Sequence, residues 1–217
     1  MCGRYTLDDA PKLAAKFKAY TDHFEMVKPN YNVAPTQSMP VVVAKEGKNQ
    51  LQLMHWGIAR TLGKDVVKEL INTRSEKAFD RFWNKTVLHQ RCLVPASGFY
   101  EWKATKDGKH PFFIHPKDQD IFAFAGIYSE FINKGGQKIQ GYSILTTDAN
   151  QEMSTIHSRM PIILRDDEYE AWLHAPDDRE AIEPLLHPYH DDGLELYEVS
   201  RAVNVPKNNS PDLLLPV

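Results

Sequence analysis

Long apolar runs are missing from this chain of 217 residues. None approaches the ~20 apolar residues that a membrane-spanning helix needs, and no charged segment followed by an apolar one opens the chain as an export signal would. Only two cysteines are present, which argues against a disulfide framework, and no clustered Cys/His spacing points to structural zinc. We therefore expect a soluble cytoplasmic protein without a metal, in which Cys92 is an ordinary buried core thiol.

The composition is that of a folded chain. With 42% hydrophobic and 11% aromatic residues it can build one substantial core, and its length fits a single domain over residues 1–217. The net charge of −3 conceals an uneven distribution. Residues 1–110 carry 18 basic and 11 acidic residues, whereas residues 111–217 carry 8 and 18, which gives net charges of +7 and −10. A basic half suits a polyanionic partner if the segregation survives folding.

The first residues, Met1-Cys2-Gly3-Arg4-Tyr5, contain the most reactive group of the chain. General aminopeptidases remove an initiator Met that precedes a small side chain, so we expect the mature chain to begin with Cys2. A cysteine thiol has an ordinary pKa of ~8.5 and a free α-amine one of ~7.7–8.0. Both nucleophiles would therefore be partly reactive near neutral pH.

Two chemistries follow from a thiol beside a free amine. In an N-terminal-nucleophile amide hydrolase, the thiol attacks a carbonyl while the amine serves as the base. Alternatively, the amine condenses with an aldehyde to a Schiff base, and the thiol closes a five-membered thiazolidine ring. A third interpretation is that Cys2 is only a small residue that enters the first strand. Position two alone favours this third interpretation, so the rest of the chain decides.

Short apolar runs separated by turn residues predict more strands than helices. A hairpin is expected across Glu46-Gly47-Lys48-Asn49, whereas residues 60–68 are polar and are expected to be mobile. Residues 31–35 are typical of a loop. Strands are expected over residues 39–44, 51–58, 92–102 (a strand pair), 111–115, 121–128, 141–147 and 196–203, and helices over residues 8–20, 166–173 and 179–186. We therefore predict a single α+β domain with a curved, mostly antiparallel sheet or open β-barrel and helices packed around it.

Three polar positions are candidates for chemistry. Asn72 follows an apolar residue at a strand-to-helix junction, where polar groups point into a cleft more often than into a core, and Ser75 or Thr73 is expected to cap the next helix. Glu101 lies among aromatic residues that would exclude water from its carboxylate, although an outward-facing Glu on an alternating strand fits the pattern equally well. His157 is flanked by polar residues before a Pro, which favours an exposed loop.

Six motifs together resemble those of the SRAP family, the SOS response-associated peptidase-like sensors of abasic sites in single-stranded DNA. They occur in the family's order and span essentially the whole chain, so the match is specific although each motif alone is weak. The motifs are Cys2-Gly3-Arg4-Tyr5, Tyr31-Asn32-Val33-Ala34-Pro35, Asn72-Thr73-Arg74-Ser75-Glu76, Ser97-Gly98-Phe99-Tyr100-Glu101-Trp102, Ile156-His157-Ser158-Arg159-Met160-Pro161 and Val203-Asn204-Val205-Pro206-Lys207-Asn208.

The resemblance implies a covalent DNA–protein crosslink, in which Cys2 forms a thiazolidine with the ring-opened sugar aldehyde of an abasic site. It also implies that Asn72 orients the terminal amine and the sugar, that Glu101 shuttles protons during Schiff-base formation, and that His157 assists sugar ring opening and reversal as an acid. The chemistry agrees, because imine formation needs a base for the attacking amine and an acid for the departing oxygen. No cofactor is implied.

The resemblance further implies a set of DNA contacts. Arg4, Arg74 and Arg159 are expected to bind phosphates, since a guanidinium binds phosphate bidentately. The remaining expected contacts are Asn32 and Pro35, in a loop at the DNA edge, and Thr146, at a strand end. The implied partner is single-stranded DNA that contains an abasic site, bound by a monomer that is nucleoid-associated if the source is bacterial.

One stretch departs from the family pattern. Many relatives carry a Pro and one or two Trp residues shortly after the Trp-Gly pair, whereas here residues 58–64 read Ile-Ala-Arg-Thr-Leu-Gly-Lys. Stacking of a base on an aromatic ring contributes ~1–3 kcal/mol, so strand-end recognition is expected to differ. Arg60 and Lys64 could compensate electrostatically.

Two other functions remain open on the sequence. The first is an N-terminal-nucleophile amide hydrolase or glutamine amidotransferase, in which Asn72 contributes to an oxyanion hole but Glu101 and His157 have no clear task. The second is a non-covalent single-strand-binding module in which Cys2 is incidental. Retention of Met1 separates them, because it blocks both covalent mechanisms and leaves simple binding intact. The family name also suggests peptidase activity, of which self-removal of Met1 is the form that the residues favour.

Overall fold

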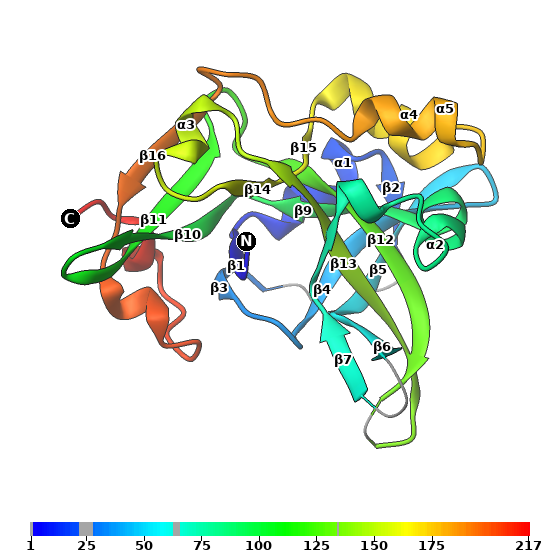
Figure 1. The fold of residues 1–217 in the computed structure, drawn as a ribbon, viewed down its shortest axis with the longest axis horizontal. Helices are drawn as coiled ribbons and strands as arrows, with labels where there is room; N and C mark the ends of the chain where they lie inside the picture. The colour runs from blue at the N-terminus through cyan, green and yellow to red at the C-terminus, as the bar shows by residue number, and fades with distance from the viewer. Residues whose placement is uncertain (1, 22–27, 63–65, 134) are drawn as a thin grey trace.

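Five strands close into a barrel (Figure 1). The computed structural model describes residues 2–21, 28–62, 66–133 and 135–217. Around the barrel, β4 (Ser38–Lys45) pairs with β5 (Lys48–Trp56), β5 with β13 (Lys138–Asp148), β13 with β12 (Phe122–Ile132), and β12 with β9 (Arg91–Ala96), which returns to β4. Each of these pairings is antiparallel except that of β13 with β5.

The parallel pairing that closes the barrel depends on a close backbone approach. It joins Gly141 to His55 and Tyr142 to Trp56. A Cβ atom on Gly141 would lie 2.1 Å from the carbonyl oxygen of Gly57, so no other residue fits without moving the backbone. The Trp56 and Tyr142 rings stack with centroids 6.3 Å apart and are both fully buried. Both rings contact Tyr5 of the N-terminal strand from inside the core.

A second, five-stranded sheet carries that N-terminal strand. Its order is β16 (Leu194–Glu198), β11 (Gly108–Pro116), β10 (Gly98–Thr105), β1 (Arg4–Leu7) and β3 (Asn30–Val33). Because β1 lies between β10 and β3, the start of the chain is an interior strand rather than a loose end, and Figure 1 shows the N-terminus near the middle of the molecule. Tyr5 fastens it to the barrel through a 2.7 Å hydrogen bond between the Tyr5 and Tyr142 hydroxyls.

Short strands and helices complete the fold. Among the described residues, no helix is long and apolar enough to cross a membrane. The additional strands are β2 (Ala19–Tyr20), β6 (Ile58–Leu62), β7 (Val66–Leu70), β8 (Asn72–Arg74), β14 (Arg159–Pro161) and β15 (Ile163–Leu164). The α-helices are α1 (Leu13–Lys16), α2 (Asn84–His89), α3 (Gln151–Ser154), α4 (Tyr169–His174) and α5 (Arg179–Ile182). The 3-10 segments are Ala10–Lys12, Ser75–Lys77, Asp166–Glu168, Glu183–Leu185, Arg201–Asn204 and Pro211–Leu214.

The predicted α+β domain with a mostly antiparallel, barrel-like sheet is confirmed, and the barrel is closed. The predicted β4–β5 hairpin is present, with Glu46 and Gly47 both at positive φ in its turn. Helical segments lie where residues 166–173 and 179–186 predicted them, although each starts or ends as a 3-10 turn.

Several local predictions differ from the structure. The helix expected over residues 8–20 is limited to a 3-10 turn at Ala10–Lys12 and to α1, because Ala19 and Tyr20 pair with β5 as β2. Residues 31–33 are part of β3 rather than a loop, because they pair with β1. Residues 60–62 and 66–68 lie in the paired strands β6 and β7, where only a polar stretch was expected, whereas residues 63–65, including Lys64, lie outside the described part. The helix expected directly after Ser75 begins only at Asn84. The last strand ends at Glu198, where a new 3-10 segment follows.

Candidate active site

Cys2 lies two residues before the first residue of β1 and is fully buried. Its Sγ donates to the carbonyl oxygen of Arg4 at 3.6 Å, a weak contact because a thiol is a poor donor. Burial, followed by the negative charge of Glu101, raises the pKa of the Cys2 thiol well above its ordinary value. The thiol is therefore protonated at neutral pH, and it needs a proton acceptor to react as a nucleophile.

Asn72 is brought to Cys2 by the pairing of β8 with β13, in which Asn72 lies opposite Ile144. Its Nδ2 donates a 2.7 Å hydrogen bond to the carbonyl oxygen of Cys2. The Oδ1 of Asn72 is buried and accepts no hydrogen bond from any residue that the structure describes. Asn72 therefore holds the Cys2 backbone with one end of its amide and offers an acceptor with the other.

Glu101 approaches the same place from β10. The neighbouring pair of Arg4 and Tyr100 sets the register between β1 and β10. Only 5% of Glu101 is exposed, which excludes the outward-facing alternative, and its Oε1 accepts a 3.3 Å hydrogen bond from the backbone N–H of Trp102. Because its charge acts on the Cys2 thiol, the carboxylate lies within electrostatic reach of the sulfur.

His157 is half-buried between α3 and β14. Its Nδ1 accepts a 3.0 Å hydrogen bond from the backbone N–H of Arg159, which places the proton of a neutral ring on Nε2. Strand β13 lies between β8, which carries Asn72, and β14, which follows His157. In β13, Thr146 pairs with Arg74 on one side and with Pro161 on the other. His157 therefore precedes a strand that is separated from β8 by β13.

The three predicted phosphate ligands are placed differently from one another. Arg74 is exposed. Arg4 is half-buried and donates from Nη1 to the Asn32 Oδ1 at 2.7 Å and to the Val203 carbonyl at 2.9 Å. Arg159 has only 12% of its side chain exposed, and it is held by carboxylates and by the carbonyl of Thr146, as described next. Only Arg74 is therefore open to solvent.

Two acids hold the Arg159 guanidinium. Its Nη1 and Nη2 contact the Glu76 carboxylate, Nη1 also contacts Asp148 Oδ1 at 2.8 Å, and Nη2 donates to the Thr146 carbonyl at 2.8 Å. The hydrogen bond with Glu76 is the main reason that the pKa of Arg159 is raised. Thr146 is itself fully buried. A phosphate that binds Arg159 must therefore compete with carboxylates.

Asn32 and Pro35 also differ in placement. Pro35 is half-buried in a turn just after β3. Asn32 is 1% exposed and donates from Nδ2 to the carbonyls of Val203, Val205 and Asn208, at 2.9–3.2 Å. Asn32 thus connects β3 to the 3-10 segment Arg201–Asn204 and to the residues that follow it, and it also positions Arg4. The sequence pattern did not indicate this structural role.

Replacing Asn32 with alanine should lower the free energy of unfolding by about 2 kcal/mol, because the change removes three hydrogen bonds that Asn32 donates to carbonyls and one that it accepts from Arg4. Urea unfolding followed by circular dichroism measures this loss. Asn208→Ala is the matched control, since it removes an exposed amide with one hydrogen bond and should cost less than about 0.5 kcal/mol. Equal losses in the two variants would refute the structural role of Asn32.

Comparison with known proteins decides the family. A family model described as SOS response associated peptidase (SRAP) matches residues 1–206. The chain belongs to the SRAP family.

Relatives of this SRAP chain align with it over most of their length. The abasic site processing protein YoqW of Bacillus subtilis (strain 168) is 35% identical over 227 residues, covering 99% of each chain. The abasic site processing protein HMCES of Gallus gallus is 31% identical, covering 88% of this chain and 67% of its own. A crystal structure of a protein from Bacteroides thetaiotaomicron superposes with a TM-score of 0.87 and 26% identity, covering 100% of each chain. The SRAP fold expected from the motifs is therefore confirmed.

The sequence pattern of the SRAP chain did not predict the acidic partners of Arg159. Glu76 closes the Asn72–Glu76 motif, and Asp148 ends β13, so the residues themselves were visible. Their pairing with Arg159 spans 83 residues for Glu76, and it depends on β8 and β14 both pairing with β13. The sequence signal for the pairing of Glu76 with Arg159 is slight: the Asn72–Glu76 motif ends in an acid, and the later motif over residues 156–161 contains the arginine.

Proposed function

We propose that this chain captures abasic sites in single-stranded DNA by forming a thiazolidine at Cys2 once Met1 has been removed. The observation that carries the proposal is the convergence of Asn72 and Glu101 on Cys2, the one residue that can supply an amine and a thiol together. The family match and the relatives named abasic site processing proteins support the lesion as the substrate.

The proposed reaction balances without a cofactor. The α-amine of Cys2 adds to the C1′ aldehyde of the ring-opened sugar, and the carbinolamine loses one water to give a Schiff base. The thiol then adds to the carbon of the C=N bond, so that one C–N and one C–S bond have formed and the thiol proton ends on the nitrogen. Met1 must leave first, because in the full-length chain the Cys2 nitrogen is part of a peptide bond.

The surrounding side chains suit these proton transfers. Glu101 is buried near the sulfur, where a carboxylate can take the proton of a thiol whose pKa burial has raised. Asn72 holds the Cys2 carbonyl and has a buried Oδ1 that can orient the amine. His157 has the Nε2 proton needed to assist ring opening as an acid. These roles are part of the proposal.

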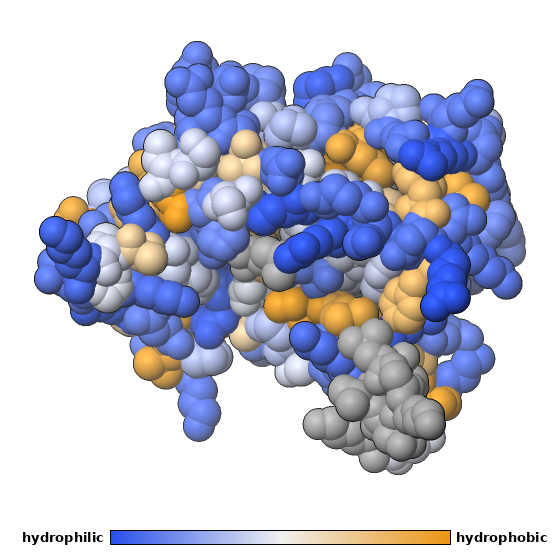
Figure 2. Space-filling model, in the orientation of Figure 1, coloured by the Kyte–Doolittle hydropathy of each residue, from blue (hydrophilic) through white to orange (hydrophobic). Residues whose placement is uncertain are grey.

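The DNA is proposed to cross the site with its phosphates on Arg74 and, after exchange with Glu76 or Asp148, on Arg159. Pro35 flanks this path, whereas Arg4, Asn32 and the buried Thr146 support it from within. Figure 2 shows hydrophobic residues reaching this face only in separate small areas among hydrophilic ones, which suits a polar ligand.

Intact mass spectrometry tests the proposal. The purified protein should lack Met1, and incubation with single-stranded DNA that bears one abasic site should add the mass of the strand, less one water, in a form that resists denaturation. Loss of Met1 without an adduct would refute the proposal and favour the amide-hydrolase alternative. Undamaged DNA of the same sequence is the control and should give no adduct.

A further inference from the structure

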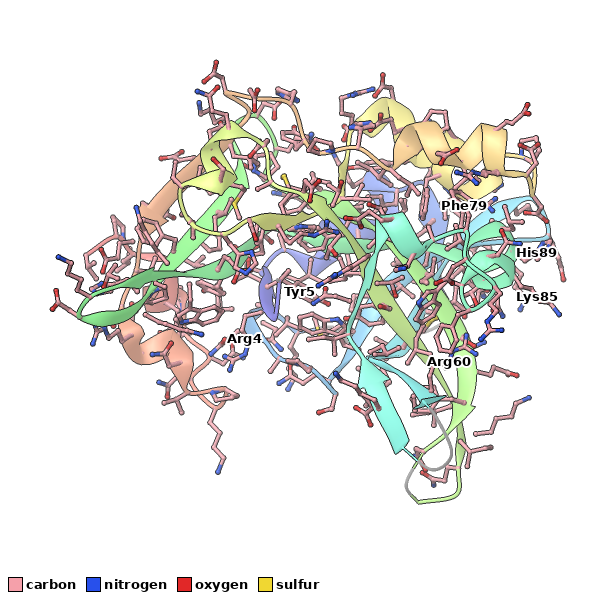
Figure 3. All side chains as sticks on the ribbon, viewed as in Figure 1. Arg4, Tyr5, Arg60, Phe79, Lys85 and His89 are labelled. Carbon is pink, nitrogen blue, oxygen red and sulfur yellow. The ribbon has the colours of Figure 1, made fainter. Side chains whose placement is uncertain are left out.

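A basic pocket lies beside α2, apart from the candidate active site. We call it the α2 pocket; its volume is about 650 Å³ and its lining includes Arg60, Arg81, Phe82, Lys85, Thr86 and His89. Figure 3 shows Arg60, Lys85 and His89 together at one side of the molecule, whereas Arg4 and Tyr5 lie nearer its middle. Nothing in the proposed chemistry at Cys2 uses these residues.

Exposed cations recur along the chain segment between the active-site strand β8 and this pocket. Arg74 ends β8, the strand that carries Asn72, and the exposed residues Lys77, Arg81 and Lys85 follow at intervals of three or four positions. Phosphates of a single strand repeat along a continuous backbone, so a row of cations suits one extended polyanion better than it suits a single small anion. These cations therefore lie on the chain segment that connects β8, the strand of Asn72, to α2 beside the pocket.

Arg60 forms one wall of the pocket and is held firmly. Its guanidinium carbon lies 5.6 Å from the Phe82 ring centroid and 5.2 Å from that of Trp83, and its Nη2 donates to the Thr86 hydroxyl at 3.2 Å. Its buried Nε has no hydrogen-bond acceptor among the described residues. Phe82 is 39% exposed, so part of an aromatic surface is available beside these cations.

The acids near the pocket are already engaged. Asp177 contacts His89 at 2.8 Å and also faces Arg91, while Asp80 accepts hydrogen bonds from the backbone N–H groups of Phe82 and Trp83. Neither carboxylate is among the residues that line the pocket. The lining therefore combines positive charge, hydroxyl groups and one open aromatic ring, which is the combination that binds a nucleotide of single-stranded DNA by its phosphate and its base.

We propose that the α2 pocket binds a nucleotide of the strand that flanks the lesion, with Arg81 and Lys85 on the phosphate and Phe82 beneath the base. This inference rests on the proposed function for the identity of the strand. It also accounts for the missing Pro and Trp after Trp56-Gly57, because Arg60, from that same stretch, completes a stacking surface with Phe82 instead.

The test compares strands of different reach. Fluorescence anisotropy would measure the affinity of the full-length protein for undamaged single strands that are short, extended on the 5′ side only, or extended on the 3′ side only. The double variant Arg81→Ala/Lys85→Ala should bind one of the two extended strands roughly tenfold more weakly, with a salt slope reduced by ~0.7 for each lost phosphate contact. Phe82→Leu should weaken the same strand roughly tenfold without changing the salt slope.

The control removes equal charge elsewhere. Lys106→Ala/Lys109→Ala acts at the exposed tip of the β10–β11 hairpin, at the opposite end of the molecule in Figure 1, and should leave every affinity unchanged. Binding of the short strand should be unchanged in all variants, which also shows that they are folded. The inference is overturned if the α2-pocket variants lose affinity for neither extended strand, or equally for all three. Because the strands lack a lesion, the outcome does not depend on whether Cys2 forms an adduct.

Discussion

Replacing Cys2 with alanine should abolish the stable adduct with abasic DNA. The variant keeps the terminal amine, so it can form a Schiff base, but it has no thiol to close the ring, and an imine reverts by hydrolysis. Denaturing gel electrophoresis after incubation with a labelled abasic strand should therefore show no band that survives heating. Reduction with borohydride should trap the imine and restore a covalent product, which separates loss of the thiol from loss of binding.

Cys92→Ala is the matched control for this experiment. Cys92 is as fully buried as Cys2, and burial likewise raises the pKa of its thiol, but it lies on β9 in the barrel core. Its removal should leave the adduct intact. A heat-stable adduct formed by Cys2→Ala at the wild-type rate would show that the Cys2 thiol is not needed and would refute the proposed thiazolidine.

Replacing Glu101 with glutamine should slow adduct formation by a factor of roughly 10²–10⁴, the range that a positioned acid or base contributes. Glutamine keeps the size of the side chain and can still accept the hydrogen bond from Trp102, but it cannot take a proton. The need for a base is acute here, since burial and the carboxylate together keep the Cys2 thiol protonated at neutral pH. Quenched-flow sampling under single-turnover conditions measures the rate.

The control is the same Glu-to-Gln replacement at a position outside the site. Glu195→Gln alters an exposed carboxylate on β16 and should leave the rate unchanged. Binding of undamaged DNA should be the same in both variants, because Glu101 is buried and the change concerns chemistry alone. A Glu101→Gln variant that crosslinks as fast as the wild type would remove this carboxylate from the mechanism.

From the sequence, it was possible to predict which residues surround Cys2, but not how they are arranged in space. Cys2, Asn72 and Glu101 each belong to a short motif, and local residue types suffice to recognise such motifs. The alternation of apolar residues also predicted most strands, because each strand buries one face. The closure of the barrel could not be predicted, since it depends on the approach of Gly141 to the backbone of Gly57, far away in the sequence.

Long-range polar contacts explain the remaining differences. Asn32 was expected to contact DNA, but its amide is occupied by carbonyls more than 170 positions away. Arg159 was expected to be open to phosphate, but the pairing of β8 and β14 with β13 brings it to Glu76 and Asp148. A polar side chain in a motif can be a ligand or a structural clamp, and only its folded surroundings distinguish the two.

The burial of Cys2 limits the stage at which Met1 can be removed. An aminopeptidase must hold an extended, accessible terminus, whereas in the folded protein Cys2 is 0% exposed and β1 is enclosed by β3 and β10. We therefore expect Met1 to be removed from the nascent chain before this sheet assembles, or afterwards by the groups around Cys2 themselves. Any residue added ahead of Cys2 that escapes both routes would leave a folded protein without its amine.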